Sequence, residues 1–217
     1  MYKSTFFVRN RTTRFIIVII IILLAFTIIP IVALDWNGAD TTGTFDVPND
    51  LTLSDQITVS NDLRLTGRGA NDLTVITAAS NKRHFYVYYN KKLYLTYIKL
   101  TGGMTTTMSE KNGGSIYAKN PTSFEIQHCE FVDNHGGKGG AIYLRGGSSL
   151  AKIMNTIFKY NYAISSNYDH GGALYLDLTE KSVTIESCQF SFNVAMWFGG
   201  AIWFVDGDPI TIFKNTF

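Results

Sequence analysis

Residues 126–145 read Ile-Gln-His-Cys-Glu-Phe-Val-Asp-Asn-His-Gly-Gly-Lys-Gly-Gly-Ala-Ile-Tyr-Leu-Arg, and two short strings in this stretch recur along the second half of the chain. Phe-x-x-Asn occurs three times, as Phe131 with Asn134, Phe158 with Asn161, and Phe190 with Asn193. Gly-Gly-Ala also occurs three times, as Gly139-Gly140-Ala141, Gly171-Gly172-Ala173 and Gly199-Gly200-Ala201. A period of about 30 residues is typical of stacked repeats, in which each unit buries its apolar face against its neighbours.

A short alternating run precedes each of these phenylalanines, and a fourth copy ends at Phe217. An isoleucine stands five positions before each phenylalanine, with another apolar residue two positions earlier: Phe124 and Ile126, Ala151 and Ile153, Val183 and Ile185, Ile210 and Ile212. The phenylalanines follow one another at steps of 27, 32 and 27 residues. Alternation with a period of two predicts a half-buried strand in every repeat.

A second short apolar run follows each glycine pair, as in Ile142-Tyr143-Leu144. No stretch after residue 35 has the apolar period of a helix. A propeller blade usually needs four strands and about 40 residues, so the shorter repeat favours a parallel β-helix. Looser alternation upstream, after the Asn-Asp pairs at residues 49, 61 and 71, extends this all-β domain over residues 45–217.

An aromatic residue occupies the same position in each second strand: Tyr117, Tyr143, Tyr175 and Trp203. The phasing turns Ile142 and Leu144 inward and places these aromatic residues in an exposed ladder on the outer wall. One interpretation is a contact surface for sugars or proteins, because rings offer a large contact area at a small entropy cost. The other is structural, because like residues stabilise a stack by contacting each other across coils.

The recurring strings themselves are interpreted as structural. The phenylalanines predict a stack in the core, and the asparagines predict turns whose amides pair from coil to coil. The glycines permit a positive φ or a close approach of two backbones. We expect no metal site and no cofactor, because the acidic turn Asp206-Gly207-Asp208 occurs once and lacks further oxygen ligands at a loop-like spacing.

The pairing of Phe-x-x-Asn with Gly-Gly-Ala-(Ile/Leu) resembles the repeat of the polymorphic outer membrane proteins of chlamydial cell surfaces. The resemblance is sharpest from Gly113 to Phe217, about half of the chain. It implies a right-handed parallel β-helix and adhesion to a host cell, a protein or a glycan. It also implies further repeats, so that we expect either a fragment of a longer protein or self-association through an uncapped last coil.

The N-terminus predicts entry into a membrane. Residues 15–34 contain no charge, and only basic charges precede them: Lys3, Arg9, Arg11 and Arg14. The length of the run favours a retained transmembrane anchor, whereas Pro30 and Ala33 favour a cleaved signal peptide. Both alternatives place the remainder outside the cytoplasm, with residues 1–34 as signal or anchor, 35–44 as linker, and 45–217 at the cell surface or secreted.

Charge excludes one class of partner. The whole chain has 19 Lys+Arg against 17 Asp+Glu, but without the four leading basic residues the balance is 15 against 17. The predicted domain therefore lacks the basic excess that nucleic-acid binding requires.

The two cysteines, Cys129 and Cys188, occupy the same template position two coils apart, with Thr156 between them. At about 4.8 Å per coil, their separation of roughly 10 Å exceeds the reach of a disulfide. We therefore expect two free thiols.

Catalysis is not expected. Glycoside hydrolysis needs two carboxylates about 5–10 Å apart on one face, and the acidic residues of the repeats occupy different template positions: Glu125, Glu130, Asp133, Asp169, Asp177, Glu180 and Glu186. Two alternatives to an adhesin stay open. One is a carbohydrate-active β-helix whose site lies in coils outside this sequence, and the other is a purely structural surface protein.

Overall fold

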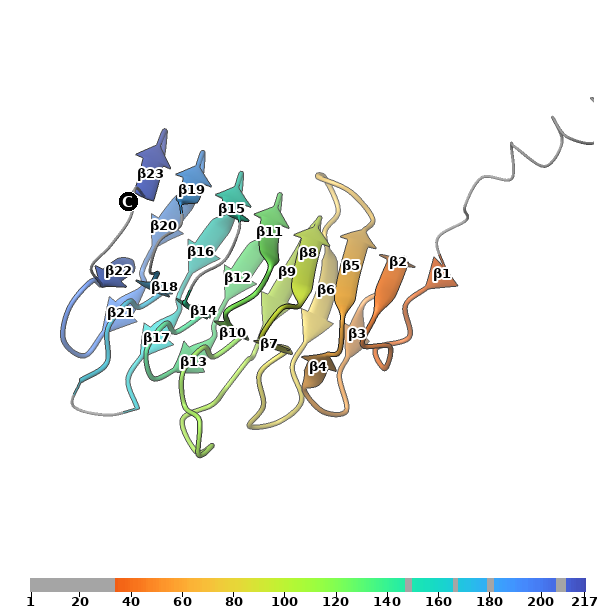
Figure 1. Cartoon of the computed structure of the whole chain (residues 1–217), viewed down its shortest axis with the longest axis horizontal. Helices are drawn as coiled ribbons and strands as arrows, with labels where there is room; N and C mark the ends of the chain where they lie inside the picture. The colour runs from red at the N-terminus through yellow and green to blue at the C-terminus, as the bar shows by residue number, and fades with distance from the viewer. Residues whose placement is uncertain (1–33, 147–149, 166–167, 179–181, 206–209) are drawn as a thin grey trace, which may run out of the picture. The chain divides into compact units, whose positions relative to one another are not determined.

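The computed structural model describes residues 34–146, 150–165, 168–178, 182–205 and 210–217. Its described part is all β, and the strands stack coil upon coil along the long axis in Figure 1. Every strand pair is parallel, and each strand pairs with the equivalent strands of the preceding and following coils. The predicted parallel β-helix is confirmed.

Sheet A has eight strands: β1 (Leu34–Asp35), β2 (Gly43–Val47), β5 (Asp62–Gly67), β8 (Lys92–Thr96), β11 (Ser123–Gln127), β15 (Leu150–Met154), β19 (Val183–Glu186) and β23 (Ile210–Phe213). Sheet B has six: β3 (Leu51–Thr52), β6 (Thr74–Thr77), β9 (Ile98–Thr101), β12 (Glu130–Val132), β16 (Ile157–Lys159) and β20 (Gln189–Ser191).

Sheet C has six strands: β4 (Ile57–Val59), β7 (Phe85–Tyr88), β10 (Ile116–Lys119), β14 (Ile142–Arg145), β18 (Leu174–Asp177) and β22 (Ile202–Val205). Sheet D has three short strands: β13 (His135–Gly136), β17 (Tyr162–Ala163) and β21 (Val194–Ala195). A complete coil therefore passes through sheets A, B, D and C in chain order.

The domain begins earlier than the sequence predicts. Leu34 of β1 pairs with Phe45 of β2, and Trp36 is only 4% exposed in the first coil, where its ring lies 6.1 Å from that of Phe85. The predicted linker, residues 35–44, is therefore part of the β-helix. A two-residue strand has too little periodicity to be recognised in a sequence.

The predicted signal or anchor, residues 1–33, lies outside the described residues. In the part of the chain that the structure describes, no helix is long and apolar enough to span a membrane.

The interior holds the predicted phenylalanine stack. Phe131, Phe158 and Phe190 are at most 3% exposed, and successive ring centroids lie 5.0 Å apart. Phe217 continues the column at 5.2 Å from Phe190. Ile142 and Leu144 also point inward and are fully buried, as predicted. Equal spacing of large apolar residues joins consecutive coils through one continuous core.

A ladder of asparagine amides runs beside this stack. Asn134 donates from Nδ2 to Oδ1 of Asn161 at 3.0 Å, and Asn161 donates in the same way to Asn193 at 2.9 Å. The same oxygens also accept hydrogen bonds from the backbone N–H groups of Asn134 and Asn161. The predicted pairing of amides from coil to coil is therefore confirmed.

Close backbone approach explains the second glycine of each pair. A Cβ on Gly140 would lie 2.2 Å from the carbonyl oxygen of Gly172, and one on Gly172 would lie 2.0 Å from that of Gly200. The first glycine has φ of 69° at Gly139, in the left-handed region. Any side chain at either position of the pair would be strained.

His84 is a buried polar residue that links neighbouring coils. Its Nε2 lies 3.0 Å from the Ile76 carbonyl oxygen and 3.1 Å from that of Thr101, and its Nδ1 lies 3.0 Å from Ser115 Oγ. Complete burial lowers the pKa of His84 from 6.5 to about 4, because the charged ring would lose its hydration. The native imidazole is therefore neutral at pH 7.

Replacing Asn161 by Ala should lower the free energy of unfolding by about 2–3 kcal/mol, because the buried N–H of Asn134 would lose its acceptor and the Phe131 carbonyl oxygen and Asn193 Oδ1 would each lose a donor. Urea unfolding measures the loss. The matched control is Asn71→Ala on an exposed turn, for which we expect less than about 0.5 kcal/mol. Equal effects of the two substitutions would contradict the role of the ladder.

Acid should weaken the fold through His84. Since the folded pKa is about 4 and the ordinary value is 6.5, its contribution is complete above pH 6.5 and is lost as the pH falls toward 4, by about 3 kcal/mol in all. Unfolding in urea at pH 7.5 and 4.5 should show a smaller loss in His84→Gln than in the native chain. Parallel losses would contradict the assignment.

Candidate functional site

The predicted aromatic ladder lies on the outer side of sheet C. Tyr117 pairs in register with Tyr143, Tyr143 with Tyr175, and Tyr175 with Trp203. The rings from Tyr117 to Tyr175 are stacked at centroid distances of 5.0 and 5.1 Å. Tyr86 of β7, which sequence analysis did not include, adds a ring 5.0 Å from that of Tyr117.

The ladder is not the exposed surface that the sequence predicts. Tyr117, Tyr143 and Tyr175 are only 4–5% exposed, and they form an apolar cluster separate from the main core. Trp203, in the last coil, is half-buried. The prediction of exposure is therefore wrong for the three tyrosines. The tyrosines pair in the predicted register. Their stacking agrees with the structural interpretation, in which like residues stabilise neighbouring coils by contacting each other.

Cations and rings from the loops before sheet C cover the ladder. The Arg83 guanidinium lies 5.1 Å from the Tyr117 ring centroid, Lys138 Nζ lies 5.2 Å from that of Tyr175, and the His170 ring stacks at 4.7 Å on Trp203. Lys138 and His170 both stand directly before a Gly-Gly pair. This shared position in the sequence could have indicated that both side chains cover the ladder.

Burial sets the electrostatics of this layer. Arg83 is fully buried, and loss of hydration lowers its pKa to about 10. The same cause raises the pKa of Tyr175 to about 12 and also raises that of Tyr143. The tyrosines therefore stay neutral at physiological pH and contact the cations through their ring faces.

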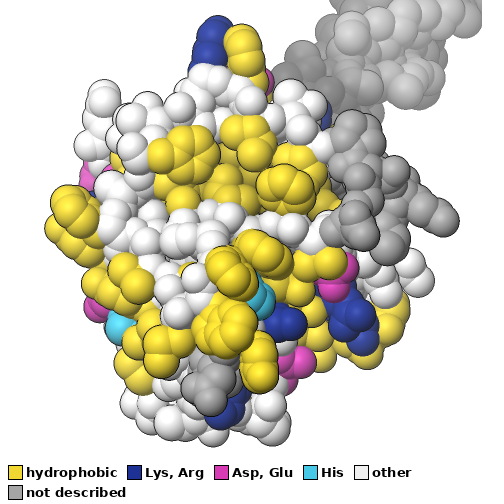
Figure 2. All heavy atoms as spheres, turned by 90° about the vertical axis from the view of Figure 1, so that its left-hand side faces the viewer, with side chains coloured by type: hydrophobic (Ala, Val, Ile, Leu, Met, Phe, Trp, Pro, Cys, Tyr) yellow, Lys and Arg dark blue, Asp and Glu magenta, His cyan; other side chains and the backbone are white. Residues whose placement is uncertain are grey.

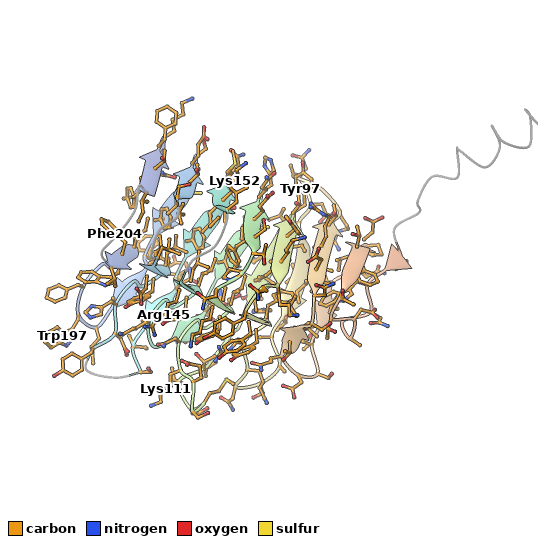
Figure 3. The ribbon with its side chains drawn as sticks, viewed as in Figure 1. Tyr97, Lys111, Arg145, Lys152, Trp197 and Phe204 are labelled. Carbon is orange, nitrogen blue, oxygen red and sulfur yellow. The ribbon has the colours of Figure 1, made fainter. Side chains whose placement is uncertain are left out.

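Several exposed aromatic residues lie on the loops that follow sheet D. Tyr168 is 66% exposed, Trp197 50% and Phe198 53%, and the rings of Tyr168 and Trp197 lie 5.1 Å apart. Trp197 projects from the end of the molecule that carries the last coil (Figure 3). In Figure 2 this end displays several apolar side chains, and Phe204 and Phe217 are exposed there. Self-association through this coil stays a prediction.

The cysteines occupy one buried column, as predicted, and neither forms a disulfide. Cys129 donates from Sγ to the Gln127 carbonyl oxygen at 3.2 Å, and its N–H donates to Thr156 Oγ1. Cys188 donates its N–H to Asn215 Oδ1 at 2.8 Å. Burial raises the pKa of Cys129 to about 12 and that of Cys188 to about 11, so neither thiol is a ready nucleophile or metal ligand.

The acidic residues of the repeats are dispersed over different faces. Arg145 Nε lies 3.0 Å from Asp177 Oδ2 on sheet C, and Lys99 Nζ lies 3.9 Å from Glu130 Oε2 on sheet B. Asp133 Oδ1 lies 2.9 Å from His135 Nε2 in a turn. Within the described residues, no three His, Cys, Asp or Glu side chains gather as a metal site. Asp206 and Asp208 lie outside those residues.

Comparison with known proteins agrees with this geometry. A family model described as "Right handed beta helix region" matches residues 65–217, more than half of the chain. The chain belongs to the right-handed β-helix family. No solved structure matches.

One similar protein is the "Probable outer membrane protein pmp7" of Chlamydia pneumoniae, 33% identical over 98 residues. The aligned part is 42% of this chain and 10% of that protein. The chain therefore spans about a tenth of the length of that relative.

Replacing Tyr175 by Ser should lower the free energy of unfolding by about 3–4 kcal/mol, because it removes a buried ring from between two others. The matched control is Tyr168→Ser, whose ring is 66% exposed and for which we expect less than about 0.5 kcal/mol. Chemical unfolding measures both. A small loss for Tyr175→Ser would restore the ladder as a candidate free surface.

Proposed function

We propose that this chain is the β-helical part of an exported surface protein that contacts cells or extracellular polymers and catalyses no reaction of its own. The observation that carries the proposal is the filled interior. Phenylalanine and aliphatic stacks occupy the space between the sheets, which leaves recognition to the outer faces and loops. Function in such solenoids comes from the surface that the stacked coils present.

The proposed location rests on two independent supports. The uncharged run at residues 15–34, with its basic flank, is typical of a segment that enters a membrane. The similar chlamydial protein carries the description of an outer membrane protein. We propose that residues 35–217 lie outside the cytoplasm, with the apolar segment as anchor or cleaved signal.

The absence of catalysis is part of the proposal. Glu130 lies on sheet B, Asp177 on sheet C and Asp133 in a turn, and each of these three carboxylates has a basic partner. Hydrolysis of a glycosidic bond needs two carboxylates together on one face. The dispersed ion pairs are suited to stabilising neighbouring strands and turns, and to a surface that binds polymers without cleaving them.

The full-length chain, purified in mild detergent, tests the proposal. Retention of labelled protein on cultured animal cells and on immobilised extracellular polysaccharides should exceed that of an unrelated β-helix protein at the same concentration. Incubation with those polysaccharides should release no reducing ends. Release of reducing or unsaturated ends would favour the enzyme. If the protein is not retained and releases no ends, both functions are contradicted and a structural surface protein is left.

A further inference from the structure

The last register position of sheet C places four side chains in adjacent strands on its outer side. Tyr88 of β7 pairs with Lys119 of β10, Lys119 pairs with Arg145 of β14, and Arg145 pairs with Asp177 of β18. This position is at the ends of the strands, and Arg145 marks it in Figure 3. Unlike the tyrosine ladder two positions earlier, this column reaches solvent.

Two tyrosine rings form one side of this surface. Tyr88 is 39% and Tyr89 40% exposed, and their rings meet edge to face at 4.2 Å. Lys119 Nζ lies 5.7 Å from the Tyr88 centroid and 5.4 Å from the Tyr89 centroid. The hydrogen bond between Lys119 and Tyr89 raises the pKa of Lys119, which keeps that ammonium charged.

The column has more positive than negative charge. Lys119 and Arg145 are neighbours in strands that lie about 4.8 Å apart, and like charges at such positions repel each other. Arg145 pairs with Asp177, but no carboxylate of the described residues pairs with Lys119. Arg145 is also 54% exposed, so its guanidinium is accessible. An anion next to both cations would relieve the repulsion.

The backbone limits what kind of ligand can bind here. Both edges of β10 and of β14 are already paired within sheet C, so a peptide cannot add to this surface as a further strand. Exposed rings beside cations suit a cyclic ligand that has an apolar C–H face and a negative group. A sugar ring with a carboxylate or a sulfate has both features.

We propose that Tyr88, Tyr89, Lys119 and Arg145 form a binding site for an anionic sugar unit. The tyrosine rings contact the sugar ring, and the two cations contact its carboxylate or sulfate. The site rests on the proposed function, because a polymer at the cell surface would supply such units. The tyrosine ladder lies on the same outer side of sheet C, two positions earlier in the same strands, and its stacked rings hold these strands in register beside the site.

Calorimetry with the full-length chain tests the site with three tetrasaccharides: a uronic acid oligomer, a heparin-derived sulfated oligomer and neutral cellotetraose. Binding of either anionic oligomer, with at least tenfold weaker binding of the neutral one, is the expected result. The two anionic probes distinguish a carboxylate from a sulfate ligand. Binding should weaken as salt is raised.

Lys119→Gln is the decisive variant and should weaken binding of the anionic oligomer about tenfold. The matched control is Lys152→Gln, a half-buried lysine in β15 of sheet A (Figure 3), which should change binding less than about twofold. Tyr89→Leu should weaken binding with unchanged urea unfolding. Equal effects of Lys119→Gln and Lys152→Gln would overturn the site.

The remaining outcomes separate the site from the proposed function. Equal binding of cellotetraose, or equally tight binding of a tetraglutamate peptide, would overturn the assignment of an anionic sugar. Retention on cells without binding of any oligosaccharide would overturn the site and leave the surface function in place. Loss of both would overturn both.

Discussion

Hydrogen bonding between identical positions of successive coils is the constraint on which the rest of the structure depends. The amide of Asn161 illustrates it, because one side chain donates to the next coil and accepts from the previous one. Such a bond forms only when every coil keeps the same register, so residues of one type must recur at one position. Buried amides without these partners would each be costly. The repeat therefore follows from the need to satisfy polar groups within the core.

The same register places aromatic residues over one another in two sheets. Sheet B contributes the phenylalanine stack in the interior, and sheet C contributes the tyrosine ladder on its outer side. Loops then cover the ladder, which leaves contact with other molecules to side chains at strand ends and on loops. The strands fix the positions of the side chains, and the loops determine which of these side chains stay accessible to solvent.

Much of this could be predicted from sequence. Phe158 and Asn161 were assigned correctly because a strict repeat fixes both the position and the direction of a side chain. The burial of Tyr143 could not be predicted, because its cover comes from loops whose path has no periodicity. Arg83 is the clearest case, since it lies before the recognisable repeats and meets Tyr117 only in the folded chain. Trp36 was missed because the two-residue strand β1, which precedes it, has no pattern.

Covalent labelling of tyrosines in the native full-length chain, read by mass spectrometry, tests the central claim most directly. The claim is that the ladder is buried and that recognition belongs to the exposed strand ends and loops. Tyr88, Tyr89 and Tyr168 should react readily, whereas Tyr143 and Tyr175 should react only after unfolding. Rapid native labelling of Tyr143 and Tyr175 would contradict the account, because the ladder would then itself be a free surface.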